Sequence, residues 1–172
     1  EMLITKKYLE GRVLQVDNCL SYAGHMNHND LFKIQDGKFR FPHEHHGAEL
    51  VQYQWPDNIP EPDVDLYKKV LGLPEDCIAR VGLHEINHSK YIPPHADQNH
   101  LGGLTIFMNN QWNTAWGGQG VAYDEGEWII SDVKFNTGVF YRTPIMHCTL
   151  PVYKNGQVRR TIQIFFDEND QN

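Results

Sequence analysis

The stretch "QVRRTIQIFF", residues 157–166, decides how this chain folds. Successive side chains of a β-strand point to opposite faces, so the stretch divides into two sets. One face carries Arg159, Thr161, Gln163 and Phe165, and the other carries Arg160, Ile162, Ile164 and Phe166. The mostly apolar set can pack on a supporting layer, while the more polar set would face a cavity. The pattern therefore predicts a half-buried strand beside a polar pocket.

Short β-type runs fill the chain from residue 79 onward, and Gly, Asn, Asp or Pro separates most of them. The runs are "ARVGLHEIN" (79–87), "LTIFMN" (104–109), "GVAY" (120–123), "EWIISD" (127–132), "GVFY" (138–141) and "HCTLPVY" (147–153). Several short strands with such turn residues and no intervening helix predict an antiparallel sandwich or barrel. We expect a mainly β fold with flanking helices, whose β-core spans residues 79–167.

Residues 1–78 are expected to support this core within a single domain of 172 residues, because no linker-like boundary divides the chain. A helix is predicted near 63–71, with Asp63 as its N-cap and Gly72 at its end.

Two shorter N-terminal patterns are less specific. "ITKKYLEGRVLQV" (4–16) fits either a strand pair or a short helix, and Asp36-Gly37 between apolar stretches is a hairpin signal.

Composition restricts the possible partners. The net charge is −7, from 15 basic and 22 acidic residues, which disfavours a broad nucleic-acid-binding face. No apolar run approaches the roughly 20 residues that span a bilayer, and no signal-peptide pattern is present. Three widely spaced cysteines match neither a disulfide framework nor a zinc site, so free thiols are expected. We therefore expect a soluble, cytoplasmic protein with no membrane partner.

A candidate metal site begins with His95 and Asp97, which follow a double proline. Residues i and i+2 at a strand start point to the same side, so an imidazole and a carboxylate can reach one ion. A third ligand must come from elsewhere, and His147 in a later predicted strand is the best candidate among ten histidines. Two His and one carboxylate form the facial triad of non-haem Fe(II) oxygenases. A chance occurrence of this short pattern stays open at this point. His100 has the wrong parity to join the site, and Gly102 with Gly103 is expected to turn into the next strand.

Arg159 supplies a second line of argument. An arginine that points inward from a core strand is unfavourable without an anionic partner, and its guanidinium suits a carboxylate bidentately. Thr161 can add a hydroxyl donor beside it. A surface ion pair for Arg159 is the alternative.

Residues 79–167 resemble the Fe(II)- and 2-oxoglutarate-dependent oxygenases, in particular the prolyl-4-hydroxylase-like group. The resemblance rests on an ordered set of motifs: "YIPPHAD" (91–97), "LTIFMNNQW" (104–112), "AWGGQGVAY" (115–123), "NTGVFYRTPIMHCTLPV" (136–152) and "RRTIQIFF" (159–166). It implies a double-stranded β-helix, a jelly-roll of the cupin type. It also implies that His95, Asp97 and His147 bind Fe(II) as the catalytic centre and that Arg159 holds the distal carboxylate of 2-oxoglutarate.

One feature departs from that family. Its members often place a tyrosine on the strand after the His-x-Asp motif, where this chain has Phe107 or Asn109. Thr105, Thr161 or Tyr91 would then have to supply the second contact to the co-substrate.

The resemblance implies a dioxygenase that consumes O2 and 2-oxoglutarate, releases succinate and CO2, and hydroxylates an unactivated C–H bond, with ascorbate as reductant. Asp97 favours hydroxylation over halogenation, which needs that coordination position for chloride. A prolyl residue in a peptide or protein is the expected substrate. A free amino acid or another small molecule is the alternative, and a non-catalytic cupin-like metal-binding protein is an alternative of another class.

Two further histidine patterns are considered. "HEINH" (84–88) fits the HExxH pattern of zinc hydrolases, but that motif needs a helix and the preceding run is β-like. His43, His45 and His46 could bind zinc, but an exposed loop is the favoured interpretation.

Overall fold

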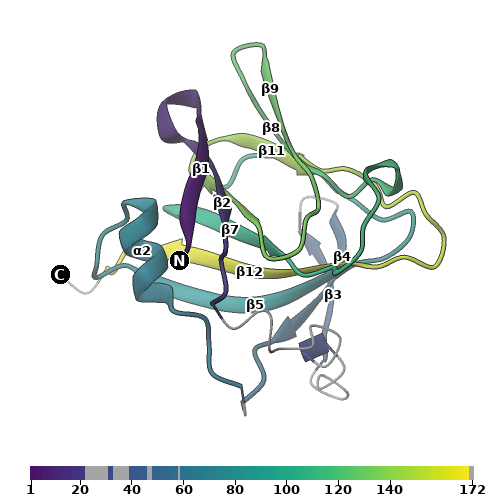
Figure 1. Ribbon diagram of the computed structural model, residues 1–172, viewed down its shortest axis with the longest axis horizontal. Coiled ribbons are helices and arrows are strands. Elements are labelled where there is room, and N and C mark those ends of the chain that lie inside the picture. The colour runs from purple at the N-terminus through teal and green to yellow at the C-terminus, as the bar shows by residue number, and fades with distance from the viewer. Residues whose placement is uncertain (22–30, 33–38, 46–47, 58, 171–172) are drawn as a thin grey trace.

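The computed structural model describes residues 1–21, 31–32, 39–45, 48–57 and 59–170. Two antiparallel sheets make up most of it (Figure 1). The strands are β1 (Leu3–Tyr8), β2 (Val13–Asp17), β3 (Phe39–His45), β4 (Ala48–Gln54), β5 (Ile78–Ile86), β6 (Ile92–His95), β7 (Gly102–Phe107), β8 (Gly120–Asp124), β9 (Glu127–Ser131), β10 (Gly138–Arg142), β11 (Met146–Thr149) and β12 (Arg159–Asp167).

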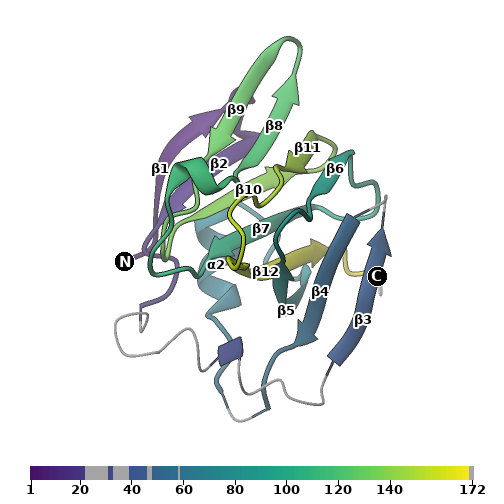
Figure 2. The same ribbon diagram turned by 90° about the vertical axis from the view of Figure 1, so that its right-hand side faces the viewer.

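The major sheet has the order β1-β2-β10-β7-β12-β5-β4-β3, and the minor sheet has the order β6-β11-β8-β9. From β5 to β12 the chain crosses repeatedly between them, because β6, the β8–β9 hairpin and β11 are minor-sheet strands while β7, β10 and β12 are major-sheet strands. Figure 2 shows this hairpin projecting from the body of the protein. This alternation is the winding of a double-stranded β-helix.

The apolar face of β12 is buried as its alternation predicts. Ile162, Ile164 and Phe166 are fully buried and belong to one core cluster with side chains of β2, β7 and the helix α2 (Val64–Leu71). The opposite set on β12 points between the two sheets, where Arg159, Gln163 and Phe165 line a cavity. The two faces of one strand thus separate the core from the cavity.

Helix α2 covers the outer side of the major sheet near β5 and β12 (Figure 1). It begins where the sequence predicts, since the Asp63 side chain accepts a hydrogen bond from the Leu66 amide at 3.1 Å. It ends at Gly72, whose φ of +69° is the left-handed conformation that glycine adopts most readily. Tyr67 and Leu71 form its buried face.

Several local expectations are resolved by the backbone. Residues 4–16 form the strand pair β1–β2, and a short 3-10 helix, Leu9–Gly11, joins the two strands. Gly102 and Gly103 were expected in a turn, but they are the first residues of β7. Gly102 is required there, since a Cβ would lie 2.4 Å from the Phe140 ring. The hairpin predicted at Asp36-Gly37 lies outside the described residues.

All three cysteines are free thiols, as expected from their spacing. Within the described part of the chain, no helix is long and apolar enough to cross a membrane.

Candidate metal centre

Two histidines face each other across neighbouring strands of the minor sheet. β6 and β11 are antiparallel, and their register places His147 opposite His95. The two ring centroids are 4.3 Å apart. Strand pairing therefore brings together two side chains that are separated by about fifty residues of sequence.

The backbone fixes the orientation of both rings. His95 Nδ1 lies 2.8 Å from the Pro93 carbonyl oxygen, and His147 Nδ1 lies 2.9 Å from the Ile145 carbonyl oxygen. A carbonyl can only accept, so each Nδ1 carries a proton, and in the neutral imidazole each Nε2 then presents a lone pair. This is the arrangement by which proteins orient metal-binding imidazoles.

Asp97 completes a three-ligand cluster. Its Oδ1 lies 3.6 Å from His95 Nε2, and its Oδ2 lies 3.5 Å from His147 Nε2. One potential ligand atom from each residue lies within 4.8 Å of the others, and no other group of three metal-ligating side chains occurs in the described ranges. The strand argument was inaccurate in detail, because His95 ends β6 and Asp97 lies in the following loop.

Arg159 is buried in the same cavity, with 4% of its surface exposed. Its Nε donates to the Gly118 carbonyl oxygen at 2.7 Å, and its guanidinium carbon lies 5.2 Å from the centre of the Phe107 ring. It forms no ion pair with any residue that the structure describes, so the alternative of a surface ion pair is wrong. Burial lowers the pKa of Arg159 to about 10, against the opposing influence of the nearby Tyr141 phenol. The cavity therefore holds a cation that no described acidic residue pairs with.

Two hydroxyl groups close to this cation are buried without hydrogen bonds to described residues, those of Thr161 and Tyr141. Thr161 is 1% exposed and lies two residues after Arg159 on β12. Tyr141 lies on β10, lines the cavity, and stacks on His147 with ring centroids 4.6 Å apart. Burial raises the pKa of Tyr141, against the opposing charge of Arg159, so its phenol is a neutral donor. Unsatisfied buried hydroxyls beside a cation suggest that a polar ligand completes them.

Tyr141 is the residue that sequence reasoning missed. Alternation along "GVFY" places Val139 and Tyr141 on one face of β10 and Phe140 on the other, and this signal could have identified it.

The remaining predicted contacts differ in position. Thr105 lines the cavity, but its hydroxyl donates to Gln163 Oε1 at 2.7 Å. Tyr91 is 47% exposed and is not among the residues that line the cavity. Thr105 therefore lies in the wall of the same cavity as Arg159, and Tyr91 lies on the surface. Thr161 is buried two residues after Arg159 on β12 but is not among the residues that line the cavity.

The zinc-hydrolase alternative is wrong. Residues 84–86 belong to strand β5, which ends at Ile86, so "HEINH" has no helix to place both histidines on one face. His84 is buried at the cavity wall, whereas His88 is exposed.

The histidine tract at 43–46 is only partly within the described residues. The backbone of β3 includes His43 and His45, so this segment is a strand and not the expected loop. His46 lies outside the described residues.

Comparisons with known proteins identify the fold. No family model and no curated protein matches this sequence. A prolyl-4-hydroxylase from Pseudomonas putida has a similar structure, with a TM-score of 0.74 and 12% identity over 91% of this chain and 92% of that chain.

Two further solved structures are similar over most of their lengths. A prolyl hydroxylase from Trichoplax adhaerens, solved with a peptide fragment of the hypoxia inducible factor oxygen degradation domain, gives a TM-score of 0.70 at 14% identity, over 91% and 84% of the two chains. An oxidoreductase of the 2OG-Fe(II) oxygenase family from Burkholderia pseudomallei gives a TM-score of 0.69 at 13% identity, over 94% of this chain and 88% of that chain. Together with the strand order, they confirm the double-stranded β-helix.

Proposed function

We propose that this protein is an Fe(II)- and 2-oxoglutarate-dependent dioxygenase that hydroxylates an unactivated C–H bond. One observation carries the proposal: two oriented imidazoles and a carboxylate converge in the same cavity as a buried arginine that forms no ion pair with the described residues. The donor set is that of the facial triad, and the cation is suited to a carboxylate ligand. A merely structural metal site would not need this arginine.

The three ligands would be His95, Asp97 and His147. They supply two neutral nitrogens and one negative oxygen and leave coordination positions open for a co-substrate and O2. When bound, the iron and 2-oxoglutarate supply the oxidising chemistry, and the products are succinate, CO2 and the hydroxylated substrate. The protein's own groups bind, orient and exclude water.

Arg159 would bind the distal carboxylate of 2-oxoglutarate. The hydroxyls of Thr161 and Tyr141 are the proposed second contacts. Tyr141 lies near the guanidinium, Thr161 follows Arg159 by two residues on β12, and both hydroxyls are buried without a hydrogen bond to a described residue. The Thr105 hydroxyl already donates its hydrogen bond to Gln163 Oε1, so it could only accept a hydrogen bond from a ligand. The binding of a dianion would relieve the unfavourable burial of the arginine charge.

A prolyl residue in a peptide or protein is the proposed substrate. Two structures of this fold are prolyl hydroxylases of other organisms, and one of these is in complex with a peptide. These likenesses support a polypeptide substrate, while the reaction itself rests on the cavity. Ascorbate would serve as the reductant that maintains ferrous iron.

The test measures succinate formation from 2-oxoglutarate with Fe(II), ascorbate and O2, with and without proline-containing peptides. Wild-type protein is expected to form succinate and to add one oxygen atom to a prolyl peptide. Asp97→Ala is expected to abolish both signals, and His88→Ala, a histidine exposed outside the cavity, should retain them.

Two other outcomes would redirect the proposal. Succinate formation that is stimulated by free amino acids but by no peptide would replace the polypeptide substrate with a small molecule. Metal binding without any 2-oxoglutarate turnover, even without a prime substrate, would favour the non-catalytic cupin-like protein instead.

A further inference from the structure

The carboxylate of the candidate metal centre, Asp97, lies in a loop between the two sheets. Residues 96–101 connect β6 of the minor sheet to β7 of the major sheet, and Asp97 lies near the start of this loop. Apart from the two imidazoles at 3.5 and 3.6 Å, no residue in the described ranges binds the Asp97 carboxylate. The position of this oxygen ligand therefore depends on the backbone of the loop.

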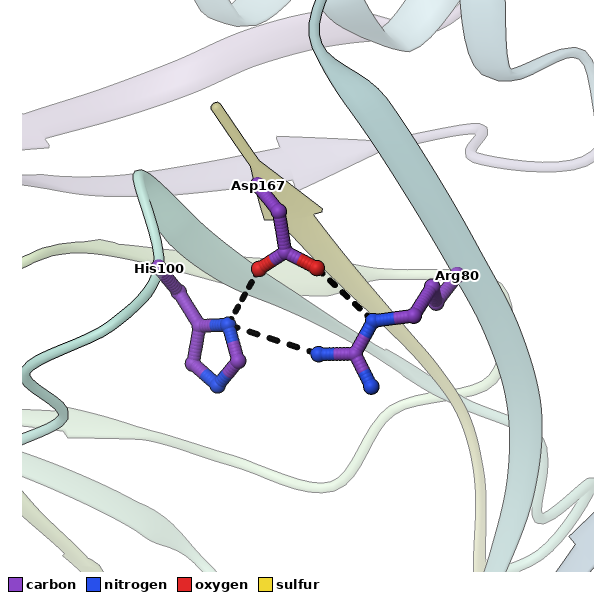
Figure 3. A network of polar contacts seen from close by, with 3 residues as sticks. All are labelled: Arg80, His100 and Asp167. Atoms are coloured by element: carbon purple, nitrogen blue, oxygen red, sulfur yellow. Dashed lines mark hydrogen bonds and ion pairs between the residues drawn. The ribbon is translucent and has the colours of Figure 1, made fainter. Parts of the chain in front are cut away.

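The far end of the loop is anchored to the major sheet by a network of three residues, Arg80, His100 and Asp167, which we call the Asp167 network (Figure 3). Asp167 at the end of β12 accepts hydrogen bonds from His100 Nδ1 and from Arg80 Nε, the latter at 2.7 Å. Leu101, the residue after His100, donates a hydrogen bond from its backbone amide to the Phe166 carbonyl oxygen at 2.7 Å.

The protons of the network place Asp167 at its centre. His100 Nδ1 must carry a proton in order to donate to a carboxylate, so the 3.5 Å contact between Arg80 Nη2 and the same nitrogen joins two donors. That contact adds no hydrogen bond, and both Arg80 Nε and His100 Nδ1 donate to the Asp167 carboxylate. Partial burial alone would raise the pKa of Asp167, but the hydrogen bonds and charges of Arg80 and His100 lower it overall, which keeps the carboxylate ionised.

The network also touches the cavity wall. The His100 ring stacks on Phe165 at 4.8 Å, and the Arg80 guanidinium lies 5.8 Å from the centre of the same ring. Phe165 lines the cavity that contains Asp97 and both histidines. The loop is thus fixed by a charged hydrogen-bond pair and by packing against a residue of the candidate site.

We propose that Arg80, His100 and Asp167 are positioning residues that hold the 96–101 loop so that Asp97 reaches the metal. This inference rests on the proposed function, because it takes Asp97 as a metal ligand. None of the three residues would touch the metal or the substrate. Their effect would be transmitted through the backbone between His100 and Asp97.

The experiment compares wild-type protein with His100→Phe, Asp167→Asn and the control Glu168→Gln. Phenylalanine keeps a ring to stack on Phe165 but removes Nδ1, and asparagine keeps the shape of Asp167 but removes its charge. Glu168 is the exposed carboxylate next to Asp167 and lies outside the network. Mn(II) serves as the probe, and its affinity is measured from the electron paramagnetic resonance signal of the free ion. Amide hydrogen exchange of residues 96–101 is followed in metal-free protein.

Loss of a residue that orients a metal ligand typically weakens metal binding about 10- to 100-fold. His100→Phe and Asp167→Asn are expected to weaken Mn(II) binding about tenfold and to accelerate exchange in the loop, while Glu168→Gln changes neither. If both network variants retain wild-type Mn(II) affinity, the positioning role is overturned.

The two proposals fail in different ways. A wild-type protein that binds no Mn(II) overturns the metal centre, and with it the role of the network toward a metal. Amide hydrogen exchange of residues 96–101 in the metal-free variants then still tests whether the Asp167 network holds the loop. Exchange as slow as in wild type would refute that role as well. If Asp167→Asn loses its folded far-ultraviolet spectrum, His100→Phe alone decides the outcome.

Discussion

Replacement of Arg159 by methionine is expected to separate the stability of the metal-free protein from its affinity for 2-oxoglutarate. The fall in the pKa of Arg159 from 12.5 to about 10 corresponds to roughly 3 kcal/mol against the buried charged form. Methionine is unbranched and uncharged, so the substitution removes that penalty. It also loses a hydrogen bond from a charged group to Gly118, worth about 1.5–3 kcal/mol, and the contact with Phe107. The two effects nearly cancel, and the free energy of unfolding should stay within about 1 kcal/mol of wild type.

Ligand binding should respond very differently. Removing one partner of a buried charge pair costs about 2–5 kcal/mol of binding free energy, so the affinity for 2-oxoglutarate should fall on the order of 100-fold. Urea unfolding of the metal-free protein measures the stability, and calorimetric titration of Mn(II)-loaded protein with 2-oxoglutarate measures the affinity. Arg160→Met is the matched control, because Arg160 lies on the opposite face of β12 and pairs with Glu85 at 3.3 Å. It should leave 2-oxoglutarate binding unchanged.

A specific result would refute this reasoning. If Arg159→Met loses 3–5 kcal/mol of stability, as expected when a compensated buried ion pair is broken, the charge of Arg159 already has its partner in the folded chain. Retained 2-oxoglutarate affinity in the same variant would remove Arg159 from the proposed site.

Three further predictions concern stability. Thr161→Val removes a buried hydroxyl that has no hydrogen bond to a described residue, so the metal-free protein should be as stable as wild type or about 1 kcal/mol more stable. The variant should also bind 2-oxoglutarate more weakly, and a clear loss of stability in urea unfolding would contradict this reasoning. Gly102→Ala should lower the free energy of unfolding by about 1–3 kcal/mol, since its Cβ would lie 2.4 Å from the Phe140 ring. The loss should exceed that of Gly103→Ala, whose Cβ would lie 3.2 Å from Gln163 Nε2, and equal losses in urea unfolding would contradict the packing argument. Because folding lowers the pKa of Asp167, its contribution to stability is present above its unfolded pKa and is lost as pH falls through the folded pKa. Asp167→Asn should therefore lose less stability than wild type between pH 7 and pH 3, and parallel losses would contradict the ionised state of Asp167 in the folded protein.

Local alternation along the chain was sufficient to predict the two faces of β12. Period-2 patterning put Arg159 toward a cavity and Ile162, Ile164 and Phe166 toward the core, and the structure has both. Helix α2 was equally readable, because its cap at Asp63 and its end at Gly72 depend on neighbouring residues.

Patterns that depend on another segment were less informative. "HEINH" matches a zinc motif letter by letter, yet β5 pairs with β4 and β12, and this pairing makes its first residues part of a strand. Alternation along "GVFY" indicates on which face of β10 Tyr141 lies, but its stacking against His147 of the other sheet depends on the tertiary structure.

The sequence by itself determined which residues alternate, where a helix is capped and which side-chain types could form a metal and anion site, because these properties depend on near neighbours and on chemistry. Only the tertiary structure decided that His147 lies opposite His95 and that Arg159 has no ion-pair partner in the described chain. It also decided that His100, outside the metal site by parity, is bonded to Asp167, 67 residues away. The physical reason is that strand register and sheet packing set these contacts, and both arise from the summed burial of many side chains rather than from any single motif.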